Sequence, residues 1–157
     1  ESTCILASGL KGSQAKMYAI DTFKGDASDH SARDRYKKRF SKLRTDNTKD
    51  IFDRNITHFN LTSRVTAIAA DSLTASKEFC EPPNSIDLLF IDGDHSETAT
   101  RNDIEAWLLY VKRGGIVIFH DFTSNHGVPQ AIWWAIKRSY FSDLVGVYGT
   151  TIAFRVY

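Results

Sequence analysis

Apolar runs and amphipathic segments alternate along this chain. Four short runs, at residues 17–20, 65–70, 86–91 and 116–119, are apolar nearly throughout. Continuous apolar positions are typical of strands in a parallel sheet that is covered on both faces, because neither side of such a strand meets water. We therefore expect four buried, parallel strands at these positions.

Two later segments show the 3.6-residue period of a helix. In residues 97–111 the apolar side chains recur three and four positions apart, at Ile104, Trp107, Leu108 and Val111. Ser96 can cap this helix, and the Lys-Arg-Gly-Gly sequence at 112–115 is typical of a helix end. A second helix is expected over residues 128–139, with Pro129 in its first turn. Three tryptophans at helical spacing are expected in the core: Trp107, Trp133 and Trp134. Trp134 could also line a site.

The C-terminal part of the chain changes character. Residues 144–148 and 151–157 are separated by Gly149 and Thr150, which indicates an antiparallel strand pair at a sheet edge. The alternating strands and helices before this pair favour an α/β fold. The expected architecture is a Rossmann-like, doubly wound, mostly parallel sheet with an antiparallel C-terminal strand pair. A chain of 157 residues is expected to form one domain, over residues 1–157.

Composition narrows the class of protein. Hydrophobic residues make up 42% of the chain and the formal net charge is +1, so charge gives no reason to expect a nucleic acid or a membrane as partner. No apolar run approaches the ~20 residues of a membrane-spanning helix, and no secretory signal is recognisable. Cys4 and Cys80 lack metal-binding spacing and are expected to be free thiols of a cytoplasmic protein.

An acid follows each of the four apolar runs. The four acids are Asp21, Asp71, Asp92 and Asp121. Ligands bind at the carboxyl ends of the strands in an open parallel sheet, so the four carboxylates are expected to converge on one crevice. Their mutual repulsion there calls for a cation or a hydroxyl-rich ligand. The alternative is that they are four independent turn residues.

The order of the runs indicates different roles for these acids. Asp21 is placed to accept hydrogen bonds from ribose hydroxyls. Asp71 and Ser72, at the next strand end, can meet the exocyclic amine of an adenine. Asp92 and Asp121 follow neighbouring central strands and suit a hard divalent cation such as Mg²⁺, which prefers oxygen ligands.

The stretch "FIDGDHSETA", residues 90–99, admits three interpretations. As a metal or catalytic site it presents Asp92 and His95. As a phosphatase site of the haloacid-dehalogenase kind it offers Asp92 as nucleophile and Asp94 as acid. Phosphatases of this kind have Thr or Val two residues after the second acid, where this chain has Ser96, and the acidic pair expected downstream is missing. As a polar turn the stretch only caps the following helix, and Asp94 turns the chain.

The segment "SIDLLFIDGDHSETATRNDIEAWLLYVKRGGIVIFHDF", residues 85–122, resembles the second half of class I S-adenosylmethionine-dependent methyltransferases. Its "IDGDH" strand end, "GG" turn and "HD" strand end have the order and spacing of methyltransferase family 24, the relatives of macrocin-type and cephalosporin-pathway methyltransferases. "MYAIDTFKGD" and "RVTAIAADSLTAS" resemble the second and third strands of that family. The similarity covers essentially the whole chain.

The resemblance implies S-adenosylmethionine as cofactor. In the family, a first strand and a glycine-rich turn lead into a helix that begins with a Gly-x-Ser-Thr pattern. Glu1–Thr3 would be the end of that turn, so the first strand and its glycines are expected to be missing and the domain to be N-terminally incomplete. Ser2 and Thr3 would then receive the methionine carboxylate. The other expected cofactor contacts are Asp21, Asp71, Ser72 and Asp92. A methyltransferase-like domain without catalysis is the alternative.

The resemblance also implies a reaction, the methylation of a hydroxyl on a small molecule such as a sugar or natural product. In metal-dependent relatives such as catechol O-methyltransferase, the acids that end the fourth and fifth strands hold Mg²⁺, and Asp92 and Asp121 match them. His95 falls where that enzyme has its basic lysine. It is the expected general base, since an imidazole titrates near neutrality.

Three features are left open by the sequence. Phe122 stands where catechol-type enzymes have a metal-binding amide, so Asp94, His120 or water would complete a metal shell. His120 can equally be a core histidine that bonds to the backbone. The basic segment at 33–44 is either a solvated face or a lid that recognises an acidic acceptor. A homo-oligomer is compatible with the sequence.

Overall fold

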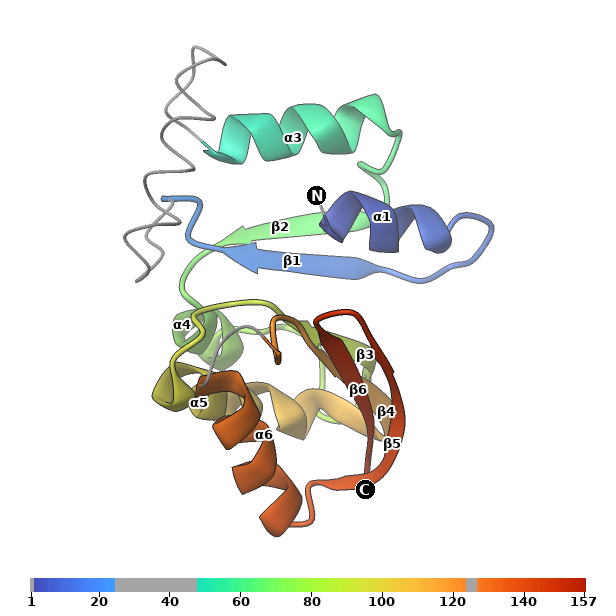
Figure 1. The fold of residues 1–157 in the computed structure, drawn as a ribbon. Helices are drawn as coiled ribbons and strands as arrows, with labels where there is room; N and C mark the ends of the chain where they lie inside the picture. The colour runs from blue at the N-terminus through green and yellow to red at the C-terminus, as the bar shows by residue number, and fades with distance from the viewer. Residues whose placement is uncertain (1, 25–47, 124–126) are drawn as a thin grey trace. The chain divides into compact units, whose positions relative to one another are not determined.

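The computed structural model describes residues 2–24, 48–123 and 127–157 (Figure 1). The basic segment at 33–44 lies outside these residues. The chain divides into two compact units, Glu1–Ala75 and Ser76–Tyr157, and each is described by itself. None of the described helices has the length and apolarity that crossing a bilayer requires.

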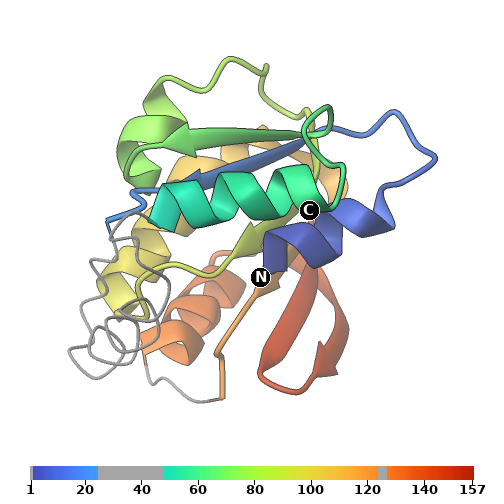
Figure 2. The ribbon, with the colours of Figure 1, turned by 90° about the horizontal axis from the view of Figure 1, so that it is seen from above.

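The first unit places two helices on one face of a pair of parallel strands (Figure 2). Its elements are α1 (Ser2–Gly9), β1 (Met17–Asp21), α3 (Thr48–His58), β2 (Val65–Ala69) and the beginning of α4 (Ser72–Lys77). The register of the strands runs from Met17 opposite Val65 to Asp21 opposite Ala69. The positions and parallel pairing of both strands confirm the sequence-based prediction, but their residues are half-buried or exposed instead of fully buried. Both helices contribute to a small core around Ala7, Ile56 and Leu61.

The second unit contains a four-stranded mixed sheet. Its elements are β3 (Ile86–Ile91), α5 (Glu97–Trp107), the 3₁₀ turn η2 (Leu108–Tyr110), β4 (Val111–Phe119), α6 (Gly127–Lys137), β5 (Phe141–Tyr148) and β6 (Thr151–Val156). The strand order is β3-β4-β6-β5. β3 and β4 are parallel, whereas β6 is antiparallel to both of its neighbours. The predicted α/β fold with an antiparallel C-terminal pair is confirmed.

The core of the second unit lies between its sheet and the helices α5 and α6. Phe119, the last residue of β4, is completely buried there, and its ring contacts those of Phe141 and Phe154. Ile104 of α5 and Ile132 of α6 belong to the same cluster. This packing fixes the carboxyl end of β4, from which the chain continues into His120 and Asp121.

The tryptophans follow the core prediction only in part. Trp107 is buried, as expected, but Trp133 is 57% exposed, so its prediction was wrong. The buried face of α6 is formed by Val128, Ala131, Ile132 and Ala135. Trp133 falls on the opposite face of the helix, because adjacent residues lie about 100° apart around a helix. Trp134 is partly buried and packs against the same core.

The predicted boundary between the helix at 97–111 and the next strand was also wrong. α5 ends at Trp107, and Val111 already belongs to β4, where it pairs with Ile86. The next pair along the ladder joins Leu88 to Ile116, so residues 112–115 bulge out of the strand. Gly115 is required there, since a Cβ on it would lie 2.9 Å from the Lys112 carbonyl oxygen. The Gly-Gly sequence therefore makes a bulge instead of a helix end.

Candidate functional site

The candidate site lies where β3 and β4 end side by side. The strands are parallel, with Ile91 opposite Phe119, and the His120 N–H donates to the Ile91 carbonyl at 3.0 Å. Asp92 follows the last residue of β3, and Asp121 follows His120. The predicted convergence of these two acids is therefore observed within the second unit.

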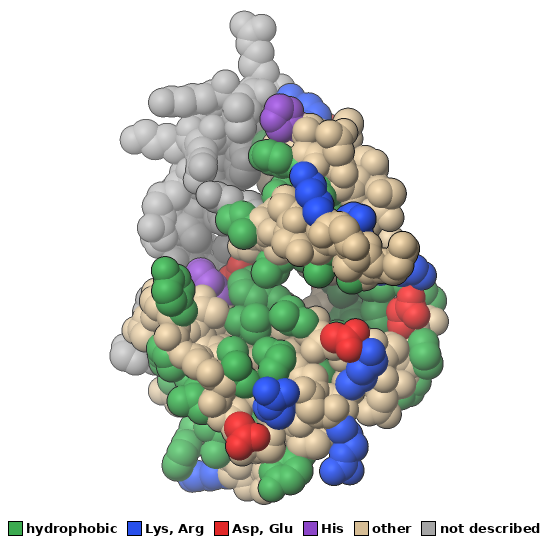
Figure 3. Space-filling view, turned by 90° about the vertical axis from the view of Figure 1, so that its right-hand side faces the viewer, with side chains coloured by type: hydrophobic (Ala, Val, Ile, Leu, Met, Phe, Trp, Pro, Cys, Tyr) green, Lys and Arg blue, Asp and Glu red, His purple; other side chains and the backbone are tan. Residues whose placement is uncertain are grey.

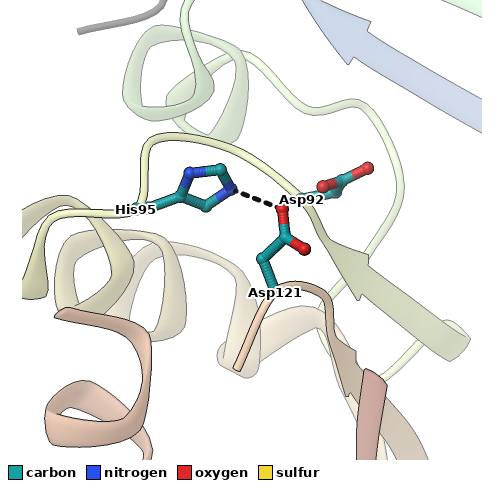
Figure 4. A group of neighbouring side chains, drawn as sticks. All are labelled: Asp92, His95 and Asp121. Carbon is teal, nitrogen blue, oxygen red and sulfur yellow. Dashed lines mark ion pairs between the residues drawn. The ribbon is translucent and has the colours of Figure 1, made fainter. Parts of the chain in front are cut away.

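Two imidazoles join the two acids. His95 Nε2 lies 3.3 Å from Asp121 Oδ2, and the ring points towards that carboxylate (Figure 4). His120 Nδ1 lies 3.2 Å from Asp92 Oδ1 and 3.3 Å from Asp121 Oδ2. One ligand atom each of Asp92, His95 and Asp121 can be chosen so that all three lie within 4.8 Å of one another. Two carboxylates and two imidazoles thus share one small volume.

The loop between β3 and α5 positions His95 through hydrogen bonds from backbone N–H groups to side-chain oxygens. The Ser96 N–H donates to Asp94 Oδ1 at 2.7 Å, and the Ser96 hydroxyl accepts from the Ala99 N–H as the N-cap of α5. The predicted cap is confirmed. The Asp94 carboxylate holds the turn, which favours the turn interpretation of this residue over its role as a phosphatase acid.

The first residue of α6 contacts this loop directly. A Cβ on Gly127 would lie 2.2 Å from the His95 carbonyl oxygen and 2.5 Å from the Glu97 nitrogen. Any side chain at this position would therefore collide with backbone. The start of α6 thus limits where the loop that carries His95 can lie.

Asp121 has a left-handed backbone, with φ of +55°. Aspartate tolerates this region better than most residues, because its short polar side chain can bond locally. The following N–H, of Phe122, donates to the Thr150 carbonyl at 3.0 Å, and the Phe122 side chain packs against the core. Phe122 thus leaves the position of the usual metal-binding amide without a polar ligand.

The electrostatics of the cluster are unfavourable in the protein alone. Burial raises the pKa of the Asp92 carboxyl above its usual range, and Asp121 raises it further, while His120 and His95 lower it. His95 Nε2 and His120 Nδ1 are shielded from water and make no hydrogen bond to any described residue. Both lie within ion-pair distance of a carboxylate but lack hydrogen-bond geometry. Unsatisfied buried groups of this kind are typical of functional sites.

The predicted cofactor residues lie in the first unit. Asp21 ends β1, and its Oδ1 accepts from the Phe23 N–H at 2.7 Å. Asp71 lies just beyond β2 at the same edge, and its Oδ1 accepts from the Thr74 N–H at 3.0 Å. Bonds from Thr74 hold the pKa of the Asp71 carboxyl below its usual range. Asp71 is therefore a helix cap as well as a candidate cofactor contact.

The remaining candidates begin helices of that unit. Ser72 is the first residue of α4, and Ser2 and Thr3 are the first two of α1. All three side chains are half-buried. Because the Asp21 carboxylate accepts a hydrogen bond from the Phe23 N–H and can accept about four in all, it has capacity for the two ribose hydroxyls of a nucleoside.

The structure adds His120 to the group that sequence reasoning selected. Asp92, His95 and Asp121 were predicted together, whereas His120 was left open between a core residue and a metal ligand. Its side chain is 36% exposed, so it is not a core histidine. The sequence signal that could have selected His120 is its position directly before the strand-end acid Asp121.

An α/β fold with parallel strand pairs, an antiparallel C-terminal pair and acids after the strands is found in Rossmann-like methyltransferases. The chain belongs to the methyltransferase domain family, methyltransferase family 24, whose profile matches residues 1–122. The family implies the use of S-adenosylmethionine. The expected family resemblance and the methyltransferase class are therefore confirmed.

Individual relatives share the fold or a part of the sequence. The O-methyltransferase NovP has 15% sequence identity and a TM-score of 0.68, over 98% of this chain and 66% of NovP. CalS11, a TDP-rhamnose 3′-O-methyltransferase of calicheamicin biosynthesis, has 18% identity and a TM-score of 0.59, over 98% of this chain and 66% of CalS11. Protein R132 of Acanthamoeba polyphaga mimivirus is 42% identical over 50 residues, which are 32% of this chain and 23% of R132. At these identities the two structures establish a shared fold.

Proposed function

We propose that this methyltransferase transfers the methyl group of S-adenosylmethionine to a hydroxyl of a small molecule, such as a sugar or natural product. The observation that carries the proposal is the cluster of Asp92, His95 and Asp121 at the ends of β3 and β4. Such a cluster can remove a proton from an acceptor hydroxyl, a requirement of O-methylation. The fold shared with NovP and CalS11 supports a hydroxyl as acceptor.

The proposed cofactor contacts come mainly from the first unit. Asp21 accepts hydrogen bonds from the ribose hydroxyls, and Asp71 with Ser72 meets the adenine. Ser2 and Thr3 bind the methionine carboxylate through the N-terminus of α1. The bound cofactor supplies an electrophilic methyl group on its sulfonium, and Asp92 contributes a further contact.

The proposed base is His95. Its Nε2 faces the two acids and takes the proton of the acceptor hydroxyl while the oxygen–methyl bond forms and the sulfur–methyl bond breaks. Asp121, at 3.3 Å, stabilises the imidazolium that results. A positioned general base contributes about 10²–10⁴-fold to rate.

Asp92 and Asp121 are also proposed as ligands of a divalent cation such as Mg²⁺, since carboxylate oxygens are the ligands it prefers. When bound, such an ion lowers the pKa of a coordinated hydroxyl. The donor set allows this role, because one ligand atom each of Asp92, Asp121 and His95 lies within 4.8 Å of the other two.

Transfer of isotopically labelled methyl groups to a panel of acceptors tests the proposal. The panel contains sugar nucleotides, catechols and RNA, each with and without Mg²⁺. We expect label on hydroxyl-bearing small molecules and formation of S-adenosylhomocysteine. His95→Ala should abolish transfer and keep cofactor affinity, whereas His58→Ala, an exposed histidine of α3, should leave both unchanged. Failure to bind either S-adenosylmethionine or S-adenosylhomocysteine in calorimetry would reject the proposed function.

A further inference from the structure

His95 Nε2 is an unsatisfied atom in an acidic environment. It is shielded from water and has no hydrogen-bond partner among the described residues, although Asp121 Oδ2 lies only 3.3 Å away. An N–H at this position would leave a donor unused. A bare lone pair would instead face the oxygens of two acids. A cation that accepts both nitrogen and oxygen ligands would bind the lone pair of the unprotonated Nε2 together with the carboxylate oxygens.

The spacing of the ligand atoms suits a small cation. Zinc bonds to nitrogen and oxygen are about 2.0–2.2 Å long, so tetrahedral ligand atoms lie about 3.3–3.6 Å apart. The His95 to Asp121 distance of 3.3 Å already meets this value. The ligand atoms of Asp92, His95 and Asp121 all lie within 4.8 Å of one another, and these side chains are 26–36% exposed. Because these side chains are partly exposed, they can rotate to bring their ligand atoms from within 4.8 Å to the separation that zinc requires.

We infer that Asp92, His95 and Asp121 form a three-ligand site for a borderline divalent cation such as Zn²⁺, with His95 Nε2 as the nitrogen ligand. Three protein ligands with an open fourth position are typical of reactive zinc sites. Imidazole raises affinity for Zn²⁺ relative to Mg²⁺, which is bound chiefly through oxygen. The cluster therefore accepts two classes of cation in different ways, Mg²⁺ through its acids and Zn²⁺ through its acids and His95.

His120 is placed to support this site from outside the ligand group. Its Nδ1 lies 3.2 Å from Asp92 Oδ1 and 3.3 Å from Asp121 Oδ2, so its positive charge or N–H acts on both carboxylates. Residues that orient ligands in this way commonly change metal affinity by about 10–100-fold. We assign His120 this positioning role.

The two roles of His95 exclude each other, because Nε2 has one lone pair. An imidazole that holds Zn²⁺ through this atom cannot take a proton with it. If His95 is the base, as the proposed function requires, Zn²⁺ should inhibit methyl transfer whereas Mg²⁺ should not. This consequence rests on the proposed function, but the binding of Zn²⁺ does not.

Calorimetric titration with Zn²⁺ and Mg²⁺ tests the inference on the whole chain. We expect one Zn²⁺ per chain and a loss of Zn²⁺ affinity of about 100-fold or more in His95→Gln, with Mg²⁺ affinity unchanged. Asp121→Asn, which tolerates the left-handed backbone, should weaken both ions. His58→Gln is the matched control and should change neither. Circular dichroism confirms that each variant is folded.

Absorption of the Co²⁺-substituted protein provides a second measurement. Nitrogen and oxygen ligands give visible bands without the strong thiolate charge-transfer band that Cys4 or Cys80 would produce. Zn²⁺ affinity that is equal in wild type and His95→Gln, or a thiolate band, would overturn the inference. Zn²⁺ binding through His95 without any methyl transfer would support the site and count against the proposed function alone.

Discussion

Asp92 illustrates how a side chain of the candidate site can oppose stability. Burial raises the pKa of its carboxyl in the folded protein, so the charged form is disfavoured relative to the unfolded chain. Because the folded-state pKa lies above the unfolded-state value, the free energy of unfolding falls as the pH rises through the interval between them. Below the unfolded-state pKa the carboxyl is protonated in both states, so it no longer lowers the free energy of unfolding.

Asp92→Asn should therefore stabilise the metal-free protein at pH 7 and abolish methyl transfer. Thermal unfolding in the presence of a chelator, at pH 7 and at pH 3, measures the effect. We expect a higher melting temperature than wild type at pH 7 and little difference at pH 3. Asp87→Asn is the control, because the Asp87 side chain is 80% exposed on the same strand. A variant that is less stable than wild type at pH 7 would contradict this account.

Gly127 controls the site through a backbone contact. In Gly127→Ala the new methyl group must displace the loop at His95, since its nearest atom would be a carbonyl oxygen at 2.2 Å. Overpacking of this kind costs about 1–3 kcal/mol. Urea unfolding should show this loss, and methyl transfer should fall together with Zn²⁺ affinity. Gly9→Ala is the control, because a Cβ on Gly9 meets nothing within 4 Å. Equal behaviour of the two variants would show that the contact is unimportant.

The sequence predicted that Asp92 and Asp121 would meet, but it left the participation of His120 open. Side chains of neighbouring residues in an extended chain point to opposite faces, so the sequence could not decide whether His120 joins Asp121 in the site or lies in the core. The left-handed backbone of Asp121 interrupts that alternation, and His120 Nδ1 and Asp121 Oδ2 come within 3.3 Å. A conformation at one residue is not visible in the hydrophobic pattern, which is why this part of the site required the structure.

At the scale of elements, the strands were predicted well and one helix boundary was not. Val111 fits the apolar period of the helix over 97–111, and it also fits the first position of β4. A single buried residue between a helix and a strand fits the periodicity of both, so the hydrophobic pattern cannot assign it to either element. The glycines that follow were likewise compatible with a helix end and with the bulge that the structure contains.

β5 is the most exposed element of the second unit. It is an edge strand, and Leu144, Val145, Val147 and Tyr148 are all exposed. Hydrophobic side chains are accordingly seen on the surface of this unit, in the lower half of Figure 3. Exposed apolar edge strands favour association with other chains.

The double substitution Val145→Lys and Val147→Lys should therefore reduce self-association. Both side chains are about half exposed, so lysines fit without disturbing the core. Light scattering after size-exclusion chromatography, over a range of protein concentrations, measures the mass of the particles. Ser142→Lys on the same strand is the control for added charge alone. Equal masses for wild type and the double variant at every concentration would contradict the expectation.

At the scale of the whole molecule, the fold class followed from the order of the apolar runs. Strands buried on both faces have few polar positions, so their sequence indicates both their existence and their parallel pairing. The division into two compact units was not predicted. It depends on which strands pair, and β1 pairs with β2 while β3 pairs with β4. Hydrophobic periodicity identifies strands but does not name their partners.

The position of β6 in the sheet affects the order in which the second unit can fold during synthesis. β6, residues Thr151–Val156, lies between β4 and β5 in the sheet, although it follows both in the chain. During synthesis β4 and β5 emerge from the ribosome before the strand that joins them. Until then β4 has β3 as its only partner in this sheet, and the aromatic contact of Phe119 with Phe154 cannot form. The sheet of the second unit therefore cannot be completed before β6 has been synthesised, and until then β5 and one edge of β4 lack their partner strand.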